Sequence, residues 1–119
     1  MTMLEPPIAF VTHAADEPAV EILINFGICT GREATPAEID DLAAVLLAAA
    51  PHVSIISEQR HEIGLETEAS LHQVRVELGH DVVPGNAVAL DALEHSLVTA
   101  AEAWARSCAA ARHADVTEV

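Results

Sequence analysis

The chain has 119 residues, among them five arginines, no lysine and nineteen aspartates or glutamates, so its formal net charge is −14 with the histidines neutral. A chain of this length can bury a core without disulfides or metal ions, and we expect one domain over residues 1–119. The arginines are scattered singly rather than gathered in a basic stripe, which argues against nucleic acid and anionic membranes as partners.

The sequence does not indicate export or membrane insertion. No apolar run reaches the ~18 residues that a membrane span requires, and no basic region precedes an apolar stretch at the N-terminus. The two cysteines, Cys29 and Cys108, are too few and too far apart for a disulfide framework or a paired zinc motif. We therefore expect a cytoplasmic protein with reduced thiols and no bound cofactor.

The first two predicted strands lie near the N-terminus. We expect residues 1–7 to be a flexible leader, whereas residues 8–12 are short and apolar, as is typical of an edge strand. The polar segment 13–18 has the length of a hairpin loop, so the edge strand should pair with residues 20–28. That run is the longest aliphatic and β-branched stretch, and we predict it to be the central strand. Its alternate residues share one face: Val20, Ile22, Ile24, Phe26 and Ile28.

The clearest local signal is the start of a helix. Thr35 and Glu38 form a capping box around Pro36, which stands at the first helical position. We expect this helix to end at Ala50, because Pro51 cannot continue it. The predicted buried stripe consists of Ile39, Leu42, Leu46 and Ala49.

A hairpin is predicted to follow this helix. Residues 52–62 read as a strand with a bulge near Ile56, residues 64–67 as the turn, and residues 69–79 as the returning strand. From Gln73 to Leu78 the returning strand alternates between polar and apolar residues, which is typical of a half-buried strand. One of its faces carries His72, Val74, Val76 and Leu78.

The last predicted element is a long helix. Asn86 can cap it, and its periodic pattern runs to about Arg112, with residues 114–119 as a flexible tail. Its core-facing stripe consists of Leu90, Leu93, Leu97, Ala100, Trp104 and Cys108. We interpret Trp104 as a core residue rather than part of a ligand site.

The order strand, strand, helix, strand, strand, helix predicts a two-layer α+β sandwich. We expect a mostly antiparallel four-stranded sheet with both helices on one face. A crossover from residues 20–28 to residues 53–62 leaves room for residues 69–79 between them. The arrangement is similar in outline to ferredoxin-like folds, an analogy that carries no function.

One candidate binding site is the segment formed by Cys29, Gly31 and Arg32. It follows the central strand and precedes a helix N-terminus, where backbone N–H groups could hold an anion or lower a thiol pKa. Fewer residues separate the cysteine from the arginine than a phosphatase-type loop needs. The alternative is a connecting loop in which Gly31 makes the turn and Cys29 is a small buried hydrophobic residue.

A second candidate site is on the hairpin, where His61, Glu62 and His72 could bind zinc or supply acid and base groups. The spacing matches no HExxH motif, and strand alternation leaves open whether the two histidines point the same way. The alternative is a solvated, salt-bridged hairpin end.

The sheet face turned away from the helices is the candidate interface. It carries the aliphatic residues Leu23 and Ile56 among many charged ones, and Arg60 and Arg75 could pair with carboxylates of a second copy. We therefore expect a homodimer or a higher homo-oligomer.

Three classes of function remain open at this point. The first is a small acidic interaction or structural module that forms homo-oligomers. The second is a small enzyme or metal-binding protein that uses the His61, Glu62 and His72 cluster or the segment from Cys29 to Arg32. The third is a sensor of a small polar or cationic molecule. A deep pocket lined by the named groups would favour the second and third classes.

Overall fold

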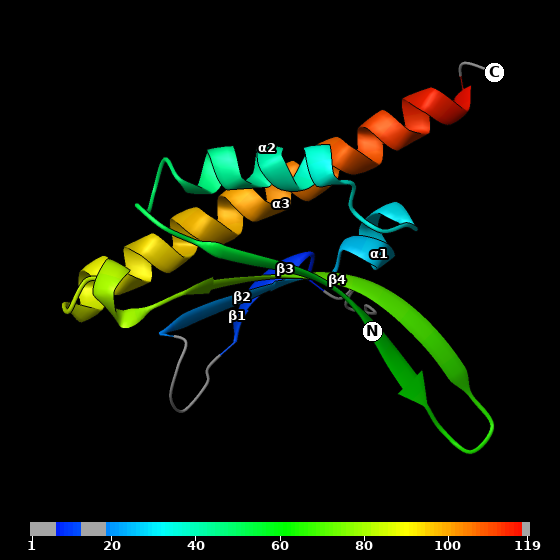
Figure 1. Ribbon diagram of the computed structural model, residues 1–119, viewed down its shortest axis with the longest axis horizontal. Helices are drawn as coiled ribbons and strands as arrows, with labels where there is room; N and C mark the ends of the chain where they lie inside the picture. The colour runs from blue at the N-terminus through cyan, green and yellow to red at the C-terminus, as the bar shows by residue number, and fades with distance from the viewer. Residues whose placement is uncertain (1–6, 13–18, 118–119) are drawn as a thin grey trace, which may run out of the picture.

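The computed structural model describes residues 7–12 and 19–117, with side chains through residue 111. Figure 1 shows their arrangement. The expected leader at residues 1–6 and the expected hairpin loop at residues 13–18 lie outside the described residues. The elements in chain order are β1 (Ala9–Thr12), β2 (Val20–Ile24), α1 (Phe26–Thr30), α2 (Pro36–Leu46), β3 (Ser54–Ile63), β4 (Glu68–Leu78), the 3₁₀ turn η1 (His80–Val82) and α3 (Ala87–Thr117).

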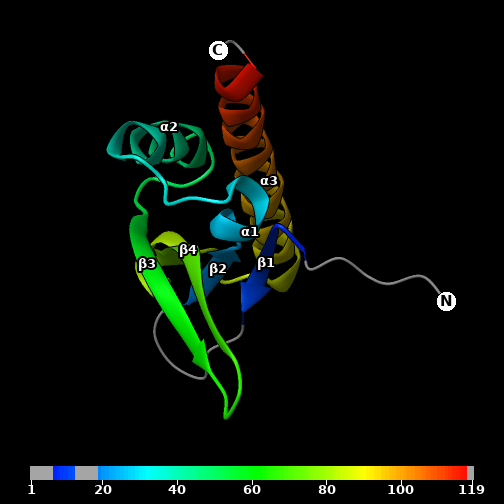
Figure 2. The same ribbon diagram turned by 90° about the vertical axis from the view of Figure 1, so that its right-hand side faces the viewer.

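The four strands form one sheet in the order β1, β2, β4, β3, and every neighbouring pair is antiparallel. This confirms the expected α+β class and the expected place of β4 between β2 and β3. The long helices α2 and α3 both lie over one face of the sheet (Figures 1 and 2). The element order contains one helix that the sequence did not predict, the short α1, so the expected succession of six elements does not hold.

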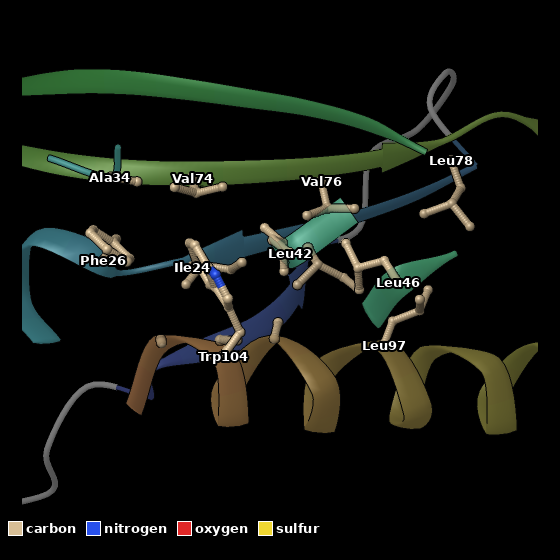
Figure 3. Packing of buried hydrophobic residues seen from close by; sticks show 14 of the residues in the cluster. Ile24, Phe26, Ala34, Leu42, Leu46, Val74, Val76, Leu78, Leu97 and Trp104 are labelled. Atoms are coloured by element: carbon tan, nitrogen blue, oxygen red, sulfur yellow. The ribbon is translucent and has the colours of Figure 1, made fainter. Parts of the chain in front are cut away.

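The core lies between the sheet and the two long helices, as Figure 3 shows. Alternate residues of β2 and β4 point toward the helices, and Ile22 and Val76 stand opposite each other in the register with no exposed surface. The helices contribute Leu42, Leu97 and Trp104 to the same cluster. Full burial of such an aliphatic side chain contributes roughly 1.5–3 kcal/mol. Packing of the sheet against the two long helices therefore stabilises both layers by burying their apolar faces.

The central strand is shorter than predicted, because β2 ends at Ile24 and the chain then turns into α1. The side chain of Asn25 donates to the carbonyl of Pro7 and accepts from Gln73, which fixes the turn. A Cβ on Gly27 would lie 2.8 Å from the backbone nitrogen of His72, so only glycine lets α1 rest on β4. The predicted place of Ile28 on one strand face with Val20, Ile22 and Ile24 is wrong, because Ile28 lies in α1 and 53% of its surface is exposed.

The capping box of α2 is confirmed, with Thr35 and Glu38 exchanging both side-chain to backbone hydrogen bonds. The helix ends at Leu46 rather than at Ala50. The amides of Ala49 and Ala50 both donate to the carbonyl of Leu46, so the last residues tighten into a turn ahead of Pro51. Ala49 is consequently exposed and not part of the buried stripe.

The hairpin of β3 and β4 is paired without interruption, so the predicted bulge near Ile56 is wrong. The last helix begins as expected, with the side chain of Asn86 accepting from the amides of Val88 and Ala89. It continues to Thr117, past the predicted end, because no glycine or proline interrupts the sequence there. No helix among the described residues is long and apolar enough to span a membrane.

Candidate functional site

The segment of Cys29, Gly31 and Arg32 is not an open loop. Cys29 lies in α1, its thiol directed to the carbonyl of Ala105 at 3.7 Å, and Gly31 ends the helix with a φ of 77°. This left-handed conformation is the reason for a glycine at that position. The expected turn at Gly31 agrees with this geometry, whereas Cys29 lies in a helix and is half-buried rather than a buried residue of a loop.

Arg32 is used within the chain. Its two Nη atoms donate to the two carboxylate oxygens of Glu38, each at 2.7 Å, and Nη1 also donates to the carbonyl of Glu33. This hydrogen bonding lowers the pKa of Glu38 to about 2, although burial alone would raise it, and the amide of Thr35 lowers it further. The arginine thus joins the segment after α1 to the N-terminus of α2 rather than presenting itself to an anion.

A groove of about 500 Å³ runs between α2 and α3 beside this ion pair. Its floor holds Trp104, whose indole N–H donates to the carbonyl of Glu38 at 2.8 Å and whose ring lies 5.0 Å from that of Phe26. Burial raises the pKa of the Cys108 thiol to about 12, and Glu38 acts in the same direction. A thiol that keeps its proton at neutral pH is a poor nucleophile, so the groove contains no activated cysteine.

The histidines of the second candidate site lie on the hairpin in a register that separates them from Glu62. His61 stands opposite Ser70 and His72 opposite Gln59, so both histidines belong to one face and Glu62 to the other. Within the part of the chain that the structure describes, no three His, Cys, Asp or Glu side chains are placed to hold a metal ion. The hydroxyl of Ser70 lies 3.1 Å from Nδ1 of His61, which makes a hydrogen-bonded pair.

The face of the sheet opposite the helices, which we call the open face, has Arg75 near its centre. Its guanidinium contacts three carboxylates at 3.0–3.3 Å, those of Glu21, Glu58 and Glu77. Burial by itself lowers the pKa of Arg75, but these carboxylates outweigh it and hold that pKa above its usual value. We call these four residues the open-face cluster. It contains one positively charged and three negatively charged side chains.

The predicted interface residues are brought together only in part. Leu23 and Ile56 flank Arg75 in a single row across the open face, and Phe10 extends the row beyond Leu23. Arg60 lies outside that row, opposite Leu71, and forms an ion pair with Glu62 of its own strand at 2.7 Å. Both arginines that were expected to reach a second copy therefore have carboxylate partners in their own chain.

The end of the hairpin, residues 59–70, is a projecting arm. Every residue in it is exposed, including Ile63 at 76% and Leu65 at 106%. Figure 1 shows this arm leading away from both long helices. In this stretch β3 and β4 contact each other but receive no support from β2, whose pairing with β4 ends at Val74.

Comparison of this chain with protein families, curated proteins and solved structures finds no match. The sequence pattern indicated many charged residues on the face of Arg75 but not the cluster that Glu21, Glu58 and Glu77 form around it. The missing information was the register, which decides which carboxylates stand beside the arginine. The pattern also missed the Arg32 and Glu38 pair, for which the capping-box glutamate was the available signal.

Proposed function

We propose that the protein is a small acidic interaction module of the cytoplasm that self-associates through its sheet. The observation that carries the proposal is the arm of residues 59–70, in which every residue is exposed. An isolated two-stranded hairpin is only marginally stable in water. An arm of this length is therefore best suited to a protein in which another chain covers it.

The remaining surface of the sheet supports the same proposal. None of the described helices lies over the open face, which carries half-buried Leu23 and Ile56 in a mixed polar and apolar row. Mixed character with an apolar centre is typical of modest interfaces. The outline that is similar to ferredoxin-like folds adds no argument, since such folds host many activities.

The enzyme and metal-binding alternatives have less support in the geometry. The two histidines of the hairpin face away from Glu62, Cys108 keeps its proton, and Arg32 is engaged by Glu38. A hydrophobic core, an ion-paired surface and an exposed arm agree better with binding than with catalysis.

Sedimentation equilibrium over a concentration series tests the proposal. We expect a mass that rises above the monomer value of 12.5 kDa as the concentration reaches tens of micromolar. Leu23→Glu, on the open face, shows whether that face takes part, since a buried carboxylate would weaken the association. A single monomer mass throughout the series would contradict self-association.

A further inference from the structure

β3 forms one side of the sheet, and no described strand or helix continues the sheet beyond it (Figure 2). A strand in this position directs a row of backbone N–H and C=O groups away from the sheet. β3 has ten residues, without proline or bulge, so the row is continuous. At the other side of the sheet β1 has four residues and packs against α3, which makes it a poorer template.

We propose that two copies of this chain pair through β3, antiparallel and edge to edge, with Gln59 on the twofold axis between them. The two sheets then join into one, with the helices of both copies over the same face. This inference rests on the proposed self-association and names the surface that performs it.

Strand geometry limits the registers that such a pairing can adopt. Residues that stand opposite each other in neighbouring strands point to the same face of the sheet. Side chains of β3 alternate between the two faces of the sheet. A residue of one copy can therefore stand opposite only those residues of the other copy whose numbers differ from its own by zero or an even number. One residue of β3 must therefore lie on the twofold axis, opposite its own copy.

Charge and the length of the paired stretch together select Gln59 from the residues that could occupy the axis. An axis at Glu58 or at Arg60 would place that residue opposite its own copy, with like charges in contact. An axis at Ser57 would place Glu58 opposite Ile56 and Arg60 opposite Ser54, so neither charged side chain would have a charged partner.

With the axis at Gln59, Glu58 of each copy stands opposite Arg60 of the other, which forms two symmetric pairs of opposite charge. An axis at His61 would also place Arg60 opposite Glu62, but it would pair only residues 59–63 of β3, whereas an axis at Gln59 pairs residues 55–63.

The same register pairs the apolar residues at the ends of the strand. Ile55 of one copy stands opposite Ile63 of the other, so the exposed Ile63 acquires an aliphatic neighbour on its own face. Arg60 contacts Glu62 through Nε, and a guanidinium has further donors for a second carboxylate. Charged side chains on an edge strand disfavour pairing with unrelated strands. Here Glu58 and Arg60 instead stand opposite residues of opposite charge when the partner is a second copy of β3.

Disulfide trapping on the full chain tests the register. Opposite residues of antiparallel strands have Cα atoms about 4.5–5.5 Å apart, within the range of a disulfide. We expect Gln59→Cys to give at least fivefold more covalent dimer under mild oxidation than the wild-type chain, which retains Cys29 and Cys108 as the background. Ser57→Cys and His61→Cys should each stay at that background, because four residues separate the two equivalent cysteines by about 13 Å.

A mixture of the Ser57→Cys and His61→Cys chains provides the second measurement. These positions stand opposite each other in the proposed register, so the mixture should form a mixed covalent dimer that neither chain forms alone. Arg60→Glu should weaken the dimer about tenfold by placing carboxylates opposite each other, and Arg106→Glu, with the same charge change on exposed α3, should not.

The outcomes separate the two proposals. If sedimentation shows a dimer but Gln59→Cys forms no more covalent dimer than the wild-type chain, β3 pairing is overturned while self-association stands. Leu23→Glu would then test the open face. Equal cross-linking of Ser57→Cys alone and Gln59→Cys would overturn the register. A wild-type chain that stays monomeric would overturn both proposals.

Discussion

The two halves of β4 make the same hydrogen-bonded pairing with β3 but have opposite surroundings. Val74, Val76 and Leu78 are at most 1% exposed, because β2 lies beside them and the helices lie over them. Glu68, Ala69 and Ser70 pair with β3 in the same continuous register and are all exposed. Strand pairing is thus a local property of the hairpin, whereas burial depends on which elements lie beside and above it.

Under the proposed self-association, this difference should separate the residues that stabilise the fold from the residues that contact another chain. The half of the hairpin under the helices belongs to the core cluster, so changes there should alter the free energy of unfolding. The arm contributes little apolar burial within its own chain, so changes there should mainly alter contacts with other chains. Three comparisons of matched variants test this distinction.

The largest effect should come from Trp104→Ala. Its side chain is 6% exposed, contacts the ring of Phe26 and donates to the carbonyl of Glu38. We expect a loss of ~3–5 kcal/mol in the free energy of unfolding. Leu65→Ala, at the tip of the arm, should stay within about 0.5 kcal/mol of wild type. Urea unfolding of both variants measures this. Similar losses would contradict the division of the molecule into the arm and the body, by which we mean the described residues outside 59–70.

A smaller effect should come from Glu38→Gln, and it should depend on pH. The pKa of Glu38 is lowered from 4.5 to about 2 in the folded chain, chiefly by Arg32, so its ionised form stabilises the fold above pH 4.5. That contribution is lost as the pH falls from 4.5 toward 2. We expect Glu38→Gln to cost about 1–2 kcal/mol at pH 7 and much less at pH 2.

Unfolding free energies measured at both pH values provide the check. Glu66→Gln, an equivalent change in the exposed turn of the arm, is the control and should alter neither value. A loss from Glu38→Gln that is equal at pH 7 and pH 2 would show that the ion pair with Arg32 is not the cause.

The smallest effect should come from the helix cap. Thr35→Ala removes the acceptor for the amide of Glu38, and we expect a cost of ~1 kcal/mol. Thr67→Ala makes the same chemical change in the exposed turn of the arm and should cost less than half as much. Comparison of the two urea midpoints decides whether the cap stabilises the body, and equal midpoints would contradict it.

The candidate sites show where interpretation of the sequence reaches its limit. Alternation along the strands correctly placed Leu23, Arg75 and Ile56 on one face, because side-chain direction follows from position within a strand. It could not show that Arg75 is held by three carboxylates of its own chain, since those residues come from three different strands. Contacts between strands depend on register, and register is decided by the packed sheet.

Elements with local signals follow from the sequence alone. The capping box at Thr35, the cap at Asn86 and the alternation from Val74 to Leu78 depend on neighbouring residues alone. By contrast, the break of the central apolar run at Asn25 and its continuation as α1 depend on tertiary contacts. The strand propensity of that run is overridden because Asn25 bonds to Pro7 and Gln73, and Gly27 packs on the backbone of His72.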